Sequence, residues 1–221
     1  LATEMYSAGI DRLTHQPLSF SVSETTEGVH IHIIDAELMG KGEKEKKDLY
    51  IEGVQNNGII NHYEYIINSE GTIEIRHVLK PEGKMPLWFP RIGLTLTVSD
   101  ALDQVKWYGR GPQENYPDRK TGYPMGIYAS TVQAMYEPYL MPQDYGLRTD
   151  VRWLQLTTDK GIGLQFKMNE WFNFNIYPYS TDNLTKAMYT YQLQKQKGMT
   201  LNLDYATTGV GCTARGVFGA Y

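Results

Sequence analysis

Charged and aromatic side chains are concentrated in one short run, residues 109–119, among glycines and prolines that favour an irregular loop. Glu114 and Asp118 are the acids of this run, and Arg110 and Arg119 are its bases. Such groups can pair as an arginine–carboxylate fork that holds a loop, or they can hydrogen-bond the hydroxyls of a sugar. The residue types allow both uses.

Tyrosine is unusually frequent, with 17 tyrosines against 6 phenylalanines. Its apolar ring and polar tip suit half-wet surfaces such as sugar sites, although tyrosines also line the rims of β-sandwiches. Arg148 is a further candidate, either for a ligand or as a partner of Glu114 or Asp118. The tyrosines best placed for binding lie in connections rich in proline, glycine and charge: Tyr116, Tyr136, Tyr139 and Tyr145.

Other reactive groups give weaker signals. Glycoside hydrolysis needs two carboxyl groups across the scissile bond, and the sequence singles out no such pair. His30 and His32 lie two apart on one side of an expected strand, but no third metal ligand has a recognisable position. We interpret them as a solvent-facing pair and expect neither a metal nor a cofactor in this chain. A nucleophile elbow, a phosphate-binding loop and a dinucleotide fingerprint are missing from the sequence.

Composition narrows the partners of the 221-residue chain. The formal net charge is -4, and no cluster of lysine and arginine is interleaved with aromatics, so nucleic acid is not expected. No apolar run reaches the roughly 18 residues that span a bilayer, so a membrane is not expected either. One cysteine, Cys212, excludes an intrachain disulfide. The chain starts at Leu1 rather than at methionine, and we expect it to be a piece of a longer protein.

Period-2 alternation of apolar residues predicts half-buried strands throughout. Residues 29–33, 92–98 and 172–176 each place their apolar side chains on one face. Asn68-Ser69-Glu70-Gly71 predicts a hairpin between 59–67 and 72–79, and Asn56-Asn57-Gly58 predicts one between 49–55 and 59–67. We therefore expect an all-β antiparallel sandwich that forms a single domain over residues 1–221.

One short helix is expected over residues 183–191. Thr181 or Asp182 would cap it, and Leu184, Ala187 and Met188 would share its buried face.

Several motifs follow one another in a fixed order. The first is Trp107-Tyr108-Gly109-Arg110-Gly111-Pro112-Gln113-Glu114-Asn115-Tyr116-Pro117-Asp118-Arg119. Around it stand Pro90-Arg91-Ile92-Gly93, Met135-Tyr136-Glu137-Pro138-Tyr139, Gln143-Asp144-Tyr145-Gly146-Leu147-Arg148, Phe172-Asn173-Phe174-Asn175, Leu201-Asn202-Leu203-Asp204 and Gly209-Val210-Gly211. In type and order they resemble the C-terminal domain of the large, Escherichia-type β-galactosidases of glycoside hydrolase family 2.

The resemblance implies an antiparallel supersandwich of the galactose mutarotase-like type. It also implies a parent enzyme that cleaves terminal β-galactosides with retention on the two glutamates of a (β/α)₈ barrel, which lies outside these residues. The present chain would then be non-catalytic. Its partners would be β-galactosides, the remaining domains of the parent and, as a further possibility, copies of itself.

The family also reaches its active site through a loop near the end of this domain, where the best-known member has a tryptophan. An ungapped continuation of the motifs lands near Arg215-Gly216, without a tryptophan, so Arg215 is the candidate for a sugar contact there. With Glu114, Tyr116 and Arg148 it completes the predicted substrate-binding residues.

Three other functions are compatible with the residues. The chain could be a carbohydrate-binding module or a purely structural domain that buttresses the barrel or a subunit contact. An aldose epimerase of the same fold would need His62 or His77 as its base, because no histidine follows His77.

Overall fold

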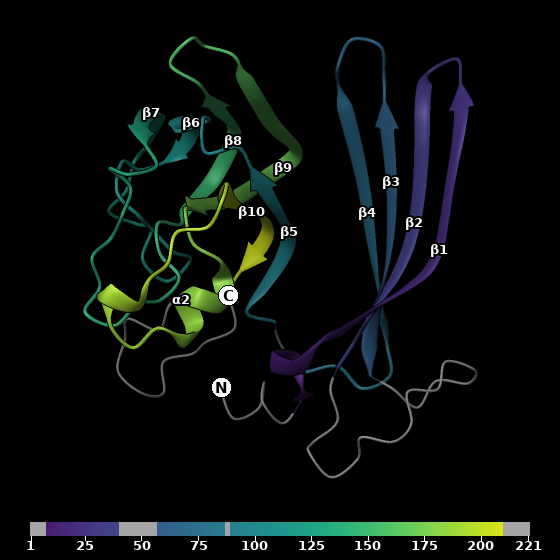
Figure 1. Ribbon diagram of the computed structural model, residues 1–221, viewed down its shortest axis with the longest axis horizontal. Coiled ribbons are helices and arrows are strands. Elements are labelled where there is room, and N and C mark those ends of the chain that lie inside the picture. Colours follow the sequence, from purple (N-terminus) through teal and green to yellow (C-terminus); the bar gives the residue numbers. More distant parts are fainter. Residues whose placement is uncertain (1–7, 40–56, 87–88, 210–221) are drawn as a thin grey trace. The chain divides into compact units, whose positions relative to one another are not determined.

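The computed structural model describes residues 8–39, 57–86 and 89–209. The chain divides into two compact units, Leu1–Trp88 and Phe89–Tyr221, and each is described by itself. The single domain expected over residues 1–221 stays a prediction. The elements, shown in Figure 1, are η1 (Ile10–Arg12), β1 (Thr14–Thr25), β2 (Gly28–Leu38), β3 (Gly58–Ile67), β4 (Ile73–Glu82), β5 (Arg91–Val98), β6 (Gln104–Arg110), β7 (Met125–Thr131), β8 (Arg148–Thr157), β9 (Gly163–Tyr177), α2 (Thr181–Lys186), η2 (Thr190–Gln192) and β10 (Met199–Thr207).

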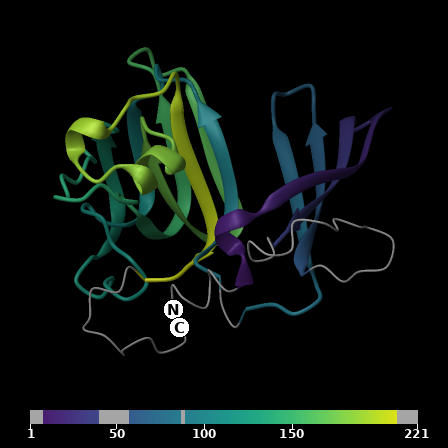
Figure 2. The ribbon, with the colours of Figure 1, turned by 60° about the horizontal axis from the view of Figure 1, so that its bottom comes forward.

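Unit 1 is a four-stranded antiparallel sheet in the order β1-β2-β3-β4 (Figures 1 and 2). The turn between β3 and β4 confirms the predicted hairpin, because the Asn68 side-chain oxygen accepts hydrogen bonds from the backbone N–H groups of Glu70 and Thr72, both at 3.0 Å. Gly71 takes the left-handed conformation that this turn requires, with φ +82°. The alternation predicted in β2 is also confirmed as a strand.

The predicted hairpin between residues 49–55 and 59–67 is wrong, because the strand over 59–67 has other partners. Strand β3 pairs with β2 on one side and with β4 on the other, so neither of its edges is left for a third strand. Residues 49–55 themselves lie outside the described ranges. Alternation identifies a strand, but it does not choose the strand's neighbour.

Unit 2 is built on a six-stranded antiparallel sheet in the order β5-β10-β9-β8-β6-β7. The last strand, β10, lies between β5 and β9 (Figure 2), so β5 pairs with a strand from the far end of the chain. Apolar side chains on one face of this sheet make a common core that includes Trp107, Leu154, Phe172, Phe174 and Leu201. The described strands all pair antiparallel, which confirms the all-β class.

The opposite face of β9 and β10 is polar and yet buried. Along these two strands Asn175, Asn202 and Asp204 alternate with the apolar core residues, and all three are almost fully shielded from solvent. Buried polar groups require hydrogen-bonding partners. This face therefore requires a network, and the network is the centre of the candidate site.

The predicted helix is present but is shorter than expected. It spans Thr181–Lys186 and is capped by Ser180, whose hydroxyl oxygen accepts from the Asn183 backbone N–H at 3.0 Å; the prediction of Thr181 or Asp182 as the cap is wrong. Ala187 is already extended, so the helix ends there and a separate 3₁₀ turn follows. As a result Leu184 and Ala187 are buried, whereas Met188 is 55% exposed.

Across the part of the chain that the structure describes, no helix is long and apolar enough to cross a membrane.

Candidate functional site

Glu114 is buried in the loop that follows β6, and both of its carboxylate oxygens are engaged. One oxygen accepts a hydrogen bond from Arg119 Nη2 at 2.8 Å and another from the Tyr139 hydroxyl. The other oxygen accepts from the Gly146 backbone N–H at 2.8 Å. One carboxylate thus bonds Arg119 of its own loop and also holds Tyr139 and Gly146, which lie 25 and 32 residues farther along the chain. The ion pair between Glu114 and Arg119 is the arginine–carboxylate clamp that the residue types suggested.

Arg148 lies close to this clamp but does not form the ion pair with Glu114 or Asp118 that the sequence suggested as one reading. Its Nη1 donates to the Gly146 carbonyl at 2.9 Å, and its guanidinium lies 5.4 Å from the centre of the Trp107 ring. Burial lowers the pKa of Arg148 to about 10, although the charges of Glu114 and Glu137 favour its protonated form. Arg148 therefore links the loop, through the Gly146 carbonyl, to the core residue Trp107.

Tyr116 is buried beside the same cluster. The Arg119 guanidinium lies 5.8 Å from its ring centre, and the backbone N–H of Arg119 donates to the Tyr116 carbonyl at 2.8 Å. Burial raises the pKa of the Tyr116 hydroxyl, and the negative charges of Asp144 and Glu114 raise it further. The structure thus brings Glu114, Tyr116 and Arg148 together, whereas Arg215 lies outside the described residues. Their role in substrate binding stays a prediction.

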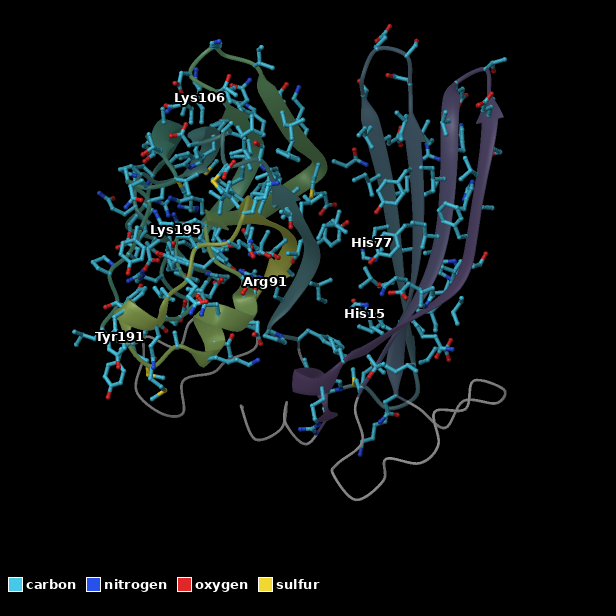
Figure 3. All side chains as sticks on the ribbon, in the orientation of Figure 1. His15, His77, Arg91, Lys106, Tyr191 and Lys195 are labelled. Carbon is cyan, nitrogen blue, oxygen red and sulfur yellow. The ribbon has the colours of Figure 1, made fainter. Side chains whose placement is uncertain are left out.

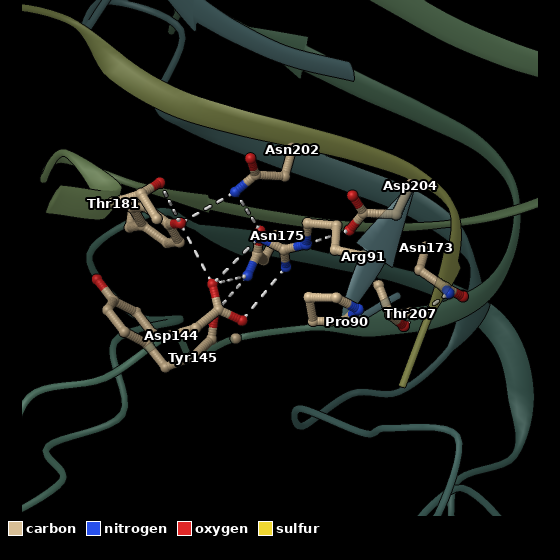
Figure 4. A network of polar contacts seen from close by, with 12 residues as sticks. Pro90, Arg91, Asp144, Tyr145, Asn173, Asn175, Thr181, Asn202, Asp204 and Thr207 are labelled. Carbon is tan, nitrogen blue, oxygen red and sulfur yellow. Dashed lines mark hydrogen bonds and ion pairs between the residues drawn. The ribbon is translucent and has the colours of Figure 1, made fainter. Parts of the chain in front are cut away.

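A second network covers the polar face of β9 and β10 (Figure 4). The Asp144 carboxylate accepts from Asn175 Nδ2 at 2.9 Å and from the Tyr177 hydroxyl at 3.2 Å, and Arg91 Nη2 donates to it at 3.3 Å. Asn202 Nδ2 donates to Asn175 Oδ1 at 2.8 Å and to the Tyr177 hydroxyl at 3.0 Å. The loop before β8 is therefore fastened to β5 and β9 by side-chain hydrogen bonds, and Asn202 joins β10 to the same network.

Asp204 stands at the end of this network. Its Oδ2 lies 3.1 Å from Arg91 Nε, within ion-pair distance but outside hydrogen-bonding geometry. Burial raises the pKa of the Asp204 carboxyl to about 7, because the desolvation of its charge outweighs the attraction of Arg91, and the nearby charge of Asp144 adds to the rise. Asp204 is thus a buried acid that titrates near neutral pH.

Several of the sequence motifs contribute residues to this one network. Arg91, Asp144, Asn175, Asn202 and Asp204 all belong to quoted motifs, and all belong to this one network. Sequence reasoning did not name them as site residues. The available signal was the polar half of the alternation in 172–176 and 201–204, where asparagine and aspartate repeatedly fill the face opposite the core.

A cavity of about 370 Å³ lies in unit 2 beside the network. Tyr136, Tyr145 and Tyr179 line it, and its polar lining includes Asp100, Asp103, Lys195 and Gln196. The ring centres of Tyr136 and Tyr145 are 5.3 Å apart and the rings are perpendicular. Tyr145 is buried and its hydroxyl makes no hydrogen bond, while its carbonyl accepts from Asn175 Nδ2 at 3.0 Å. A cavity with aromatic walls and polar groups suits a small hydroxyl-rich ligand.

The four tyrosines singled out from the sequence divide between these structures. Tyr136 and Tyr145 line the cavity, Tyr139 donates to Glu114, and Tyr116 packs beside Arg119. By contrast Tyr191 is exposed and projects from the surface, whereas Arg91 lies within the unit (Figure 3).

The histidines of unit 1 differ from their sequence interpretation. His32 is half exposed, but His30 is mostly shielded, and both lie beside Glu64 on β3. The third side chain that the sequence did not reveal is thus supplied by cross-strand register. His77 stacks on Tyr63 with 4.2 Å between ring centres, its Nε2 lies 2.9 Å from Asn61 Oδ1, and burial lowers its pKa.

Comparison with known proteins agrees with the motifs. The family model described as "Beta galactosidase small chain" matches residues 6–217. A β-galactosidase of Priestia megaterium is 38% identical over 147 residues, which are 66% of this chain and 14% of the relative. A β-galactosidase of Vibrio cholerae is 31% identical over 207 residues, which are 93% of this chain and 18% of the relative.

This chain therefore spans less than a fifth of the length of these relatives. Because the family model covers nearly all of its residues, the chain belongs to the β-galactosidase small chain family.

Proposed function

We propose that this chain is a non-catalytic domain of a retaining β-galactosidase, and that it supports the sugar site of a (β/α)₈ barrel elsewhere in the parent enzyme. The main observation behind this proposal is that both carboxylate oxygens of Glu114 accept hydrogen bonds, from Arg119, Tyr139 and Gly146. A carboxylate held in this way positions a loop and has no free oxygen to attack a sugar or exchange its proton. The names and lengths of the relatives support the same assignment.

Retaining hydrolysis requires two carboxyl groups roughly 5–5.5 Å apart, one as a nucleophile and one as an acid and base. The other buried acids of unit 2 also have internal partners. Asp150 pairs with Arg110 and with Lys120 Nζ at 3.1 Å, and Asp204 lies beside Arg91. These acids have partners within the domain, and chemistry on the glycosidic bond is left to the barrel.

The first experiment is an assay of the purified 221-residue chain with a chromogenic β-galactoside. We expect no hydrolysis above the buffer rate. Turnover that survives repurification and is abolished by Glu114→Gln would overturn the proposal.

The second experiment uses the complete enzyme. Glu114→Gln should lower its melting temperature, while the kcat of the folded fraction stays within about twofold of wild type. A loss of kcat by orders of magnitude at unchanged stability would place Glu114 in the chemistry instead.

The cavity lined by Tyr136, Tyr145 and Tyr179 favours a second candidate function, an accessory carbohydrate-binding module. The Tyr145 hydroxyl is buried at the wall of the cavity without a hydrogen bond among the described residues, so a sugar hydroxyl that reached it would supply a missing partner.

Titration of the isolated chain with galactose and with lactose, followed by NMR, tests this function. Tyr145→Phe should weaken binding by about two- to tenfold, as expected for the loss of one hydrogen bond, without lowering stability. The exposed Tyr191→Phe is the control. Absence of binding to wild type at high millimolar sugar would leave only the supporting role.

A further inference from the structure

We propose that His30, His32 and Glu64 form a binding site for a divalent transition-metal ion, with Zn²⁺ as the best-fitting ion, on the four-stranded sheet of unit 1. These three residues are the one group in the described part of the chain whose histidine, cysteine and acidic side chains are arranged to hold a metal. They lie outside unit 2 and its networks. The site is independent of the proposed function.

The sheet itself brings the three side chains together. His30 and His32 are two residues apart on β2, so they project from the same face of the sheet. Glu64 is the direct cross-strand partner of His32 on β3 and therefore projects from that face as well. Both strands are internal, since β2 also pairs with β1 and β3 also pairs with β4, so the three positions are held by well-paired backbone.

The distances approach those of a coordination sphere. Glu64 Oε1 lies 3.8 Å from His30 Nδ1 and 3.8 Å from His32 Nε2, and the three possible ligand atoms all lie within 4.8 Å of one another. Zinc bonds of about 2.0–2.2 Å at tetrahedral angles place neighbouring ligand atoms about 3.3 Å apart. Small side-chain rotations would therefore suffice to bind an ion without a change in the backbone.

Arg76 orients the carboxylate. Its Nη1 donates to Glu64 Oε2 at 3.1 Å, which leaves Oε1 directed at the two histidines. Its Nε donates to Glu74 Oε1 at 2.8 Å, so a second carboxylate offsets the charge of Arg76. With neutral histidines the group of Glu64, Glu74 and Arg76 carries a formal charge of -1. A cation is therefore attracted to the cluster, and the carboxylate ligand has the outer partner that metal ligands usually have.

The donor set selects the class of ion. Two imidazole nitrogens and one carboxylate oxygen suit Zn²⁺ and similar transition metals, whereas Ca²⁺ and Mg²⁺ prefer shells made of oxygen. The side chains of His30, His32 and Glu64 are 14%, 51% and 27% exposed, so the site is open on one side for a water ligand and for exchange of the ion. Among the described residues His30 Nε2 makes no hydrogen bond, so no such bond turns the ring and its Nδ1 away from Glu64.

The test is calorimetric titration of the full chain with ZnCl₂ in a buffer that does not chelate zinc. We expect one ion per chain, and binding at least tenfold weaker for both His32→Gln and Glu64→Gln. CaCl₂ at the same concentrations should give no binding heat. Zinc should also raise the melting temperature of wild type but not of these two variants, because the ion would link the two central strands of the sheet.

The matched control is His15→Gln. His15 lies on the same sheet (Figure 3), its side chain is 63% exposed, and Asp35 and Glu37 lie 3.2 Å and 3.7 Å from its Nδ1, yet within the described ranges it belongs to no group with metal-binding geometry. Its zinc affinity should equal that of wild type. If His15→Gln weakens binding as much as His32→Gln, or if His32→Gln binds like wild type, the site is wrong; so it is if wild type binds no zinc or several ions without saturation. Because His32 is half exposed, its variant decides the matter even if Glu64→Gln fails to fold.

Discussion

The Glu114 carboxylate is the residue on which the loop of unit 2 most depends, since it accepts from Arg119, from Tyr139 and from the Gly146 backbone. Glu114→Ala would leave these donors without their acceptor in a buried place. We expect a loss of about 2–4 kcal/mol in the free energy of unfolding, and a smaller loss of about 1–2 kcal/mol for the partly exposed Arg119→Ala. Urea unfolding of the isolated chain measures both.

The control for this pair is Lys186→Ala on α2. Lys186 and Asp182 form an exposed ion pair one helical turn apart, and such pairs contribute little. The free energy of unfolding of Lys186→Ala should equal that of wild type. If Glu114→Ala were also as stable as wild type, the loop would not depend on the Glu114 clamp.

Asp204 gives the domain a distinctive pH dependence. Its carboxyl has a pKa of about 7 in the folded chain against an ordinary value of 3.8, so the folded state holds this proton more tightly than the unfolded state does. Its contribution to stability is fully present below about pH 4 and is lost as pH rises to about 7. Relative to Asp204→Asn, wild type should lose about 1 kcal/mol or more between these pH values.

Asp150 changes the stability with pH in the opposite direction. Burial opposes its charge, but hydrogen bonds from Arg110 and Lys120 prevail and lower its pKa, so its contribution is present above its ordinary pKa and is lost as pH falls. Urea unfolding from pH 2 to pH 8 for wild type, Asp204→Asn and Asp150→Asn separates the two trends, because the Asp150 contribution is lost below about pH 4 and the Asp204 contribution above it. The same slope in both variants would contradict the assignment.

Arg215 is the predicted substrate-binding residue on the loop by which the resemblance connects this chain to the active site, and it lies outside the described residues. If it hydrogen-bonds a sugar hydroxyl away from the scissile bond, Arg215→Ala in the complete enzyme should raise KM about two- to tenfold with a smaller change in kcat. Steady-state kinetics decides, and both constants at wild-type values would remove Arg215 from the site.

For single residues, the sequence indicated which side chains lie near one another better than it indicated which partners each of them has. Glu114, Tyr116 and Arg148 do come together, because their motifs carry the residue types of a buried clamp. The partners of Arg148 were not predictable, since its choice of Gly146 and Trp107 over Glu114 depends on the packing of a loop. Glu64 was missed because only cross-strand register places it beside His32.

At the scale of the elements, the pairing of β5 with β10 explains why the motif Pro90-Arg91-Ile92-Gly93 ends in glycine. A Cβ on Gly93 would lie 2.4 Å from the Leu203 carbonyl oxygen and 2.6 Å from the Asp204 Cα, both of them backbone atoms of β10. The pairing of β10 with β5 is also irregular just past this point, between Asp204 and Ala206. The glycine therefore allows close approach of two strands at an irregular place in the sheet.

Gly93→Ala should accordingly cost about 1–3 kcal/mol, as overpacking against backbone does. Gly122→Ala is the matched control, because a Cβ there would have no atom within 4 Å. Urea midpoints of the two variants give the comparison; equal midpoints would show that β10 moves aside freely.

Element types were more predictable than their ends and neighbours. Alternation identified β2, β5 and the second half of β9, because a half-buried strand leaves a period of two in any sequence. One of the two predicted neighbours of β3, residues 49–55, was wrong, because strand order depends on the whole sheet. The predicted cap of α2 was wrong because Ser180, Thr181 and Asp182 are all competent caps.

For the whole molecule, the two units differ in how much apolar surface they bury. Among the described residues of unit 1 the buried apolar side chains are Ala36, Leu38, Met39 and Ile59, whereas unit 2 has a large common core. We expect the fragment 89–221 to unfold cooperatively by itself, and the fragment 1–88 to show no cooperative transition, because the described residues of unit 1 bury few apolar side chains and such a sheet is marginal.

Urea unfolding of the two fragments, followed by tryptophan fluorescence and by circular dichroism, makes this comparison. A single domain over residues 1–221 would require that neither fragment folds alone. Cooperative unfolding of the fragment 1–88 would contradict the expectation drawn from burial.

The pairing of β5 with β10 also bears on how the chain is made. Thr95 on β5 donates to Asn202 on β10, its partner 107 residues later, and β10 is the strand through which β5 joins the sheet. At about 5–20 residues per second, a ribosome exposes β5 roughly 5–20 s before its partner emerges. During that interval β5 is without the strand that joins it to the sheet. Translation that pauses or stops before residue 199 would therefore release a nascent chain prone to aggregate.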